Sequence, residues 1–128
     1  MLTQDDLDGF YCTNDYHKHW LGLYYTDGVK FLAEKAGAYW LLDAIASHQK
    51  NPKILKSPEL QRLQFWKLKV EDGKGVLTCV VDSGYKPVVT QNIEFTDFPL
   101  KEVDIWVQNG VIPGVNRPVF VMMLKSEY

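Results

Sequence analysis

Three histidines and two cysteines carry the side chains best suited to bind a metal ion. His17 and His19 are two residues apart, so in an extended strand both imidazoles point to the same side, as two metal ligands would. Cys12 lies close enough in the sequence to be a third ligand. The spacing matches no common zinc module and no fourth ligand is defined. We therefore predict two surface histidines in a loop, and neither a metal nor another cofactor.

Asp43 is the carboxylate best placed for acid–base chemistry. It lies between Trp40 and Ser47 in a largely apolar helical stretch, where a carboxylate can be partly buried. His48 or His17 would supply the second group of such a site. Residues five apart diverge by well over a right angle around a helix, so Asp43 and His48 need a third element to bring them together. The favoured alternative is an Asp43 bonded to a backbone amide or a tyrosine hydroxyl.

Nucleophilic catalysis has little support in the sequence. Cys79 shares a predicted strand face with Leu77 and Val81, where a buried cysteine behaves as a small apolar residue. Ser47 and Ser83 both lack the strand–turn–helix glycine setting of a hydrolase nucleophile.

Aromatic residues are the compositional exception, with four Trp, seven Tyr and six Phe. Most are predicted to fill the core, and some to line an apolar pocket between helix and sheet. Trp106 shares its predicted strand face with Asp104 and Gln108, so it is the ring we expect at a groove or a subunit interface. The candidate ligand-binding residues are Tyr39, Trp40, Asp43, Trp66 and Trp106, with Tyr24 and Tyr25 as further rings of the pocket.

Helices are predicted in the first half of the chain. Thr3 is a suitable N-cap for a short helix that ends near Phe10. The aromatic-rich passage that follows, up to Tyr25, can hold a short strand or hairpin arm at residues 20–24. Thr26 or Asp27 then caps a longer helix whose apolar face is Val29, Leu32, Ala33 and Ala36, and whose second half runs from Ala38 to His48. Gly37 between the two halves marks a kink, a break or a close backbone approach.

Beyond Pro52 the apolar residues alternate with polar ones, which predicts strands. Five strands are expected, at Trp66–Val70, Val76–Val81, Val88–Phe95, Val103–Val107 and Val119–Leu124, with turns at residues 71–75 and 82–84. The last of them is apolar on both faces and should be central or covered on both sides. The lysines and prolines between Lys50 and Arg62 indicate a solvated linker.

These elements predict one α+β domain over residues 1–128, with N-terminal helices packed across the concave face of an antiparallel, roll-like meander of about five strands. The formal charge of −2 argues against general nucleic-acid binding. The sequence has no apolar run long enough to cross a membrane and begins with acidic residues, unlike a signal peptide. Two distant cysteines indicate reduced thiols. We therefore expect a soluble cytoplasmic protein without a membrane partner.

Four segments of the chain share features with known sequences: Thr26–Gln49, Phe65–Trp66, Asp82–Gly84 and Glu94–Leu100. Together they resemble a family of small bacterial proteins of unknown function. The resemblance covers most of the chain beyond Trp20 and implies proteins that are often cargo of mobile elements such as plasmids, phages or integron cassettes. It attaches neither an activity nor catalytic residues to the chain.

Three functions follow from these patterns. The first is a non-enzymatic binding module that holds a small ligand or a protein partner in an aromatic groove, because aromatic residues are abundant and catalytic spacing is absent. The second is a small enzyme with a pocket centred on Asp43. The third is a self-associating protein, a homodimer, because the strand Val119–Leu124 is apolar on both faces and sheet edges invite pairing.

Overall fold

The computed structural model describes residues 2–128 as one sheet with helices on one of its faces. In this part of the chain the helices are α1 (Gln4–Asp8), α2 (Asp27–Ala36), α3 (Tyr39–Ser47) and α4 (Pro52–Leu55), with single 3-10 turns η1 (His48–Lys50) and η2 (Lys125–Glu127). The strands are β1 (Tyr16–Lys18), β2 (Tyr24–Thr26), β3 (Leu63–Glu71), β4 (Lys74–Val80), β5 (Val89–Ile93), β6 (Glu102–Gly110) and β7 (Val119–Leu124). The α+β class is therefore confirmed.

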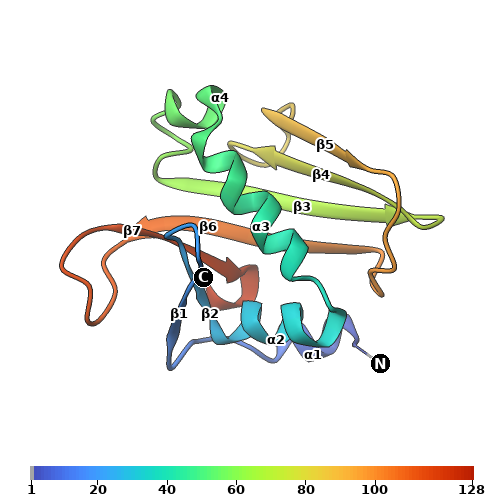
Figure 1. Cartoon of the computed structure of the whole chain (residues 1–128), viewed down its shortest axis with the longest axis horizontal. Helices are drawn as coiled ribbons and strands as arrows, with labels where there is room; N and C mark the ends of the chain where they lie inside the picture. The colour runs from blue at the N-terminus through green and yellow to red at the C-terminus, as the bar shows by residue number, and fades with distance from the viewer. Residues whose placement is uncertain (1) are drawn as a thin grey trace.

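The sheet has seven strands in the order β1-β2-β7-β6-β3-β4-β5 (Figure 1). The β2–β7 pair is parallel and every other pair is antiparallel. The prediction of a five-stranded antiparallel meander is wrong in three respects: β1 and β2 join the sheet, β6 pairs with β3 instead of β5, and the β2–β7 pair is parallel. The burial pattern explains the second difference. β3 and β6 are the longest strands, and their buried residues alternate over most of their length, which suits the middle of the sheet, whereas the shorter β5 with its polar middle (VTQNI) suits an edge.

The long helical stretch is two helices, because Gly37 breaks it. The Thr26 hydroxyl accepts a hydrogen bond from the Val29 N–H and so caps α2, as the sequence predicts. Gly37 ends α2 in the left-handed conformation (φ 60°), which glycine adopts without the steric cost of a Cβ. The chain then turns, and α3 crosses the sheet in front of β3 and β6 (Figure 1).

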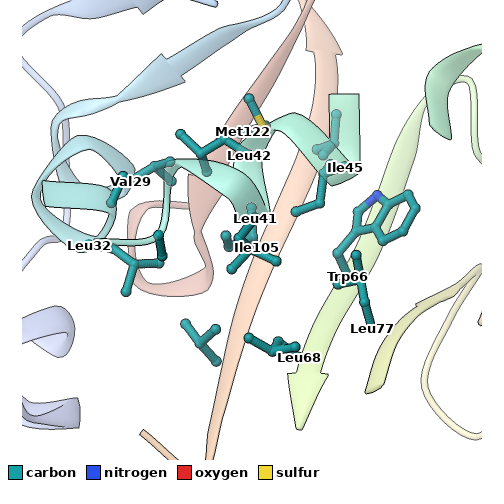
Figure 2. Packing of buried hydrophobic residues seen from close by; sticks show 14 of the residues in the cluster. Val29, Leu32, Leu41, Leu42, Ile45, Trp66, Leu68, Leu77, Ile105 and Met122 are labelled. Carbon is teal, nitrogen blue, oxygen red and sulfur yellow. The ribbon is translucent and has the colours of Figure 1, made fainter. Parts of the chain in front are cut away.

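The main core lies between α3 and the sheet. Figure 2 shows Leu41, Leu42 and Ile45 of α3 directed toward the strands, where they meet the buried residues of the facing sheet surface. These include Trp66, Leu68, Leu77, Ile105 and Met122. Full burial of each such aliphatic side chain contributes about 1.5–3 kcal/mol, so this layer is the main stabilising contact of the fold.

The opposite face of β7 has a small core of its own. Val119, Val121 and Met123 of β7 pack with Ile112, which lies in the loop between β6 and β7. The strand is thus covered on both faces and paired on both edges, which confirms its predicted central position. Because its two edges are occupied by β2 and β6, β7 offers no edge for the self-association that its sequence suggested.

The segment between Lys50 and Arg62 is not the solvated linker that its lysines suggested. Asn51 caps α4 and Pro52 occupies its first turn. Ile54 and Leu60 are fully buried in the main core. Two apolar anchors therefore fix the segment while its lysines face water. Within residues 2–128, no helix has the length and apolar character required to span a bilayer.

Candidate functional site

The face of the sheet that α3 leaves uncovered carries a groove, here named the open-face groove. Its volume is about 480 Å³, within the roughly 300–1,000 Å³ of small-molecule sites. Its floor is built from alternate residues of β3, β4 and β6, and its sides from the turn at residues 82–84 and from the start of η2. The lining residues are Phe65, Lys67, Thr78, Val80, Asp82, Ser83, Gly84, Asp104, Trp106 and Lys125.

Aromatic rings form one wall of the open-face groove. Phe65 and Trp106 are partners in the β3–β6 register, so their side chains lie on the same face of the sheet. Their ring centroids are 4.8 Å apart and the rings meet edge to face, at 89°. Tyr128 packs on Trp106 in the same manner at 5.0 Å. Phe65 and Trp106 are only partly buried, so aromatic surface remains available to a ligand.

Charged side chains lie at the other end of the same groove. Asp104 is the centre of this group: Lys67 Nζ is 3.6 Å from Oδ1 and Lys125 Nζ is 3.6 Å from Oδ2. Lys67 also lies 3.9 Å from Glu102. Asp104 is partly buried, but the N–O distances are long and the lysine side chains reach water, so each pair contributes only about 0–1 kcal/mol. Both lysines can therefore turn toward a ligand, whereas both oxygens of Asp104 already face cations.

On the helical side of the molecule, His19 and Asp43 form a close pair. The backbone N–H of Leu21 donates to His19 Nδ1 at 3.0 Å, so the ring proton is on Nε2, which donates to Asp43 Oδ1 at 2.7 Å. Trp20 Nε1 donates to the same oxygen at 2.9 Å. Because both nitrogens of the buried imidazole are occupied, His19 holds the segment before β2 against α3 and has no free nitrogen to act as a base.

His17 and Asp27 form a second pair near the start of α2. His17 Nε2 lies 2.8 Å from Asp27 Oδ1, and the backbone N–H groups of Asn14 and Asp15 donate to Oδ2 at 3.0 and 3.4 Å. The hydrogen bond from His17 is the main reason that the pKa of Asp27 lies below its ordinary value of 3.8, with the two amides adding to it and burial opposing it. Asp27 is thus an ionised anchor for residues 14–17.

The third histidine, His48, is partly buried and lies beside a buried polar network. His48 Nε2 lies 2.7 Å from the side-chain oxygen of Gln91, and its ring packs against Trp66. The amides of Gln64 and Gln49 exchange hydrogen bonds of 2.7 and 2.9 Å, and Trp66 Nε1 donates to Gln64 at 2.8 Å. Trp66 is 1% exposed. These residues satisfy one another and leave Trp66 no surface for a ligand.

The two cysteines are free thiols. Burial raises the pKa of Cys79 to about 12, which makes it a poor nucleophile, while Cys12 is exposed. His17 and His19 each bind a different carboxylate and do not converge on Cys12. Across residues 2–128, no group of three or more His, Cys, Asp or Glu side chains is arranged to hold a metal ion.

The five candidate ligand-binding residues do not form one pocket. Tyr39, Trp40 and Asp43 lie on α3. Trp66 and Trp106 are on neighbouring strands but face opposite sides of the sheet, because Trp66 is the register partner of Ile105 and not of Trp106. Of the five, only Trp106 lines the open-face groove, which agrees with its expected position at a groove.

The candidate residues on α3 lie outside the open-face groove. Burial is the main cause of the raised pKa of Tyr39, and the neighbouring Tyr25 and Glu34 raise it further. The side chain of Asp43 is 48% exposed. Neither His48 nor His17 binds Asp43, since they bind Gln91 and Asp27. Lys67, which the sequence did not single out as a site residue, occurs in the alternation that predicted the strand Trp66–Val70, whereas Phe65 lies one residue before that predicted strand.

A family model covers residues 1–128, and it describes a family of unknown function, DUF6876. The chain belongs to this family. No curated protein and no solved structure matches the chain. The DUF6876 assignment agrees with the resemblance to a family of unknown function, and it brings no activity to the site.

Proposed function

We propose that this DUF6876 protein is a non-enzymatic binding module whose open-face groove holds a small molecule with a planar apolar ring and an anionic group. The observation that supports it is the pairing of the exposed aromatic surface of Phe65 and Trp106 with Lys67 and Lys125 in a groove of about 480 Å³. Ligand sites commonly combine an apolar wall with a few polar groups in this way.

The proposed charge of the ligand follows from the hydrogen-bond donors of the two lysines in the groove. Each lysine ammonium has three N–H donors, and the ion pairs of Lys67 and Lys125 are long, at 3.6–3.9 Å. The acceptors of Asp104 are already shared between these two cations. The spare N–H donors of the two lysines suit a carboxylate or a similar anion, whereas Asp82 and Asp104, which line the same groove, balance the lysine charges.

A titration with two matched probes tests the proposal. Indole-3-acetate supplies a ring and a carboxylate, and indole-3-acetamide supplies the same ring without charge. We expect calorimetry or NMR to show tighter binding of the acetate, and Lys67→Gln or Lys125→Gln to weaken it about fivefold each, or about 1 kcal/mol. Lys69→Gln is the control, because Lys69 follows on the same face of β3 and does not line the groove. Equal binding of both probes would contradict the anionic ligand, and absence of binding would contradict the ligand class.

The alternative function is a small enzyme with a pocket centred on Asp43. The 2.7 Å contact between Asp43 and His19 favours it, and the occupied nitrogens of His19 argue against it. An activity of this kind would use Oδ2 of Asp43 as the base. Asp43→Asn should abolish it while leaving ligand binding in the open-face groove unchanged; an activity that survives the substitution would eliminate this function.

We also propose a cytoplasmic location and a bacterial, mobile-element origin. The two free thiols, Cys12 and Cys79, support a reducing compartment, and the resemblance noted in the sequence supports the origin. Fractionation of the producing cell tests the location. Recovery of the protein outside the cytoplasm would refute it.

A further inference from the structure

Strand β5 is an edge of the sheet. Within residues 2–128 it is the last strand in the sheet order and pairs only with β4. Natural edge strands are usually shortened or carry charges or proline, which prevent pairing with another chain. The opposite edge, β1, has three residues and ends at Lys18. In contrast, the five residues of β5, Val89–Ile93, contain neither a charge nor a proline.

The sequence of β5 is chemically symmetric about its middle residue. Reading VTQNI outward from Gln91, Thr90 corresponds to Asn92 and Val89 to Ile93. In an antiparallel pair of two such strands around a twofold axis at Gln91, a polar residue faces a polar residue and a β-branched residue faces a β-branched residue. Cross-strand pairs of matched chemistry stabilise antiparallel sheets.

The residues that flank β5 are complementary in the same arrangement. Phe95 is 81% exposed. When the register about Gln91 is continued past the ends of the strand, Phe95 lies opposite Pro87 of the second copy. Glu94 then lies opposite Val88 and diagonal to Lys86 of that copy, so the charged residues that flank the strand have opposite signs.

We propose that two copies of this chain associate through β5, in antiparallel register about Gln91, and form one continuous sheet. The partner is a second copy because the edge is complementary to itself in polarity and in flanking charge. The pairing leaves the open-face groove uncovered, since the groove is built on β3, β4 and β6. The dimer is therefore independent of the proposed ligand, and either can fail without the other.

Two charge variants of the full chain test the register. Thr90→Lys with Asn92→Lys places lysine opposite lysine at both cross-strand pairs, and we expect the dimer dissociation constant measured by analytical ultracentrifugation to rise about tenfold or more. Thr90→Lys with Asn92→Glu places lysine opposite glutamate at both, and the dimer should persist. Both side chains are exposed in the single chain, so both variants should fold, which circular dichroism checks.

A second pair of variants tests the flanking contact. Phe95→Ser should weaken the dimer, whereas Tyr11→Ser, at a ring 79% exposed elsewhere on the surface, should leave it unchanged. A wild-type chain that stays monomeric at high micromolar concentration would overturn the proposal. A dimer that tolerates both lysines at positions 90 and 92 would overturn the β5 interface.

Discussion

Phe65 contacts Trp106 edge to face, with ring centroids 4.8 Å apart, on the face of the sheet opposite α3. One residue along β3, Trp66 faces the other way and is buried under α3. Two adjacent aromatic residues thus have opposite roles. The first forms the wall of the open-face groove, and the second completes the core and its amide network.

Gly28 should not tolerate alanine, although alanine normally stabilises a helix by about 1 kcal/mol relative to glycine. A Cβ at Gly28 would lie 2.5 Å from Oε1 of Glu127 and 2.8 Å from a methyl group of Leu124. We expect Gly28→Ala to lower the free energy of unfolding by about 1–3 kcal/mol in urea denaturation. Gly110→Ala is the control, because a Cβ added there would have nothing within 4 Å beyond its chain neighbours. An unchanged or increased stability of Gly28→Ala would contradict the contact.

Glu127 should be a structural carboxylate that fixes the end of the chain to α2. It accepts hydrogen bonds from the Thr26 hydroxyl at 2.6 Å, from the Leu124 N–H at 3.0 Å and from the Gly28 N–H at 3.2 Å. Replacing it by alanine leaves these donors unpaired, so Glu127→Ala should cost about 1–3 kcal/mol. A double-mutant cycle with Thr26→Ala measures the coupling, and additive losses would show that the two side chains act separately.

Asp27 should make stability depend on pH in the acid range. Because its pKa in the folded protein is below the ordinary 3.8, the ionised carboxylate stabilises the fold above that value, and this contribution is lost as the pH falls through the lowered pKa. Asp27→Asn should lower the free energy of unfolding by on the order of 1 kcal/mol near neutral pH. In acid, the difference in unfolding free energy between the variant and the wild type should become smaller. Asp15→Asn, an exposed neighbouring carboxylate, serves as control. A difference in unfolding free energy that stays constant with pH would contradict a stabilising role for the charge of Asp27.

The two thiols should react at very different rates. Cys12 is exposed, while burial raises the pKa of Cys79 to about 12. Iodoacetamide should therefore modify Cys12 alone in the native protein and both cysteines in urea, as read by mass spectrometry. Rapid native labelling of Cys79 would mean that the core between β4 and α3 opens readily.

Local signals in the sequence are sufficient for much of the fold. Thr3 and Thr26 as helix caps, and the alternation of β3 and β6, follow from short-range patterns, and the structure confirms them. Strand order does not follow from such patterns, because alternation specifies a face and not a neighbour. Strand β1 is short and polar, so only its pairing with β2 identifies it as a strand.

The candidate site was predictable only in part, for a related reason. The alternation around Trp106 indicates a residue on the solvent face, and the structure places it in the groove. Whether Trp66 and Trp106 lie on the same face of the sheet depends on the β3–β6 register, which the sequence alone does not give. The partner of Asp43 is His19, 24 residues away, and that contact exists only because the segment before β2 folds back on α3.

The four tryptophan indole N–H signals in a ¹H–¹⁵N NMR spectrum locate a bound ligand directly, because they report on different sides of the molecule. Trp66 is hydrogen-bonded in the core, Trp20 is bonded to Asp43, and Trp40 lies on α3, so these three are internal controls for Trp106. On titration with indole-3-acetate, we predict that the Trp106 signal, assigned with Trp106→Phe, shifts in a saturable manner while the others stay in place. A shift of the Trp20 or Trp40 signal without a shift of the Trp106 signal, or no shift at all, would contradict the open-face groove as the binding site.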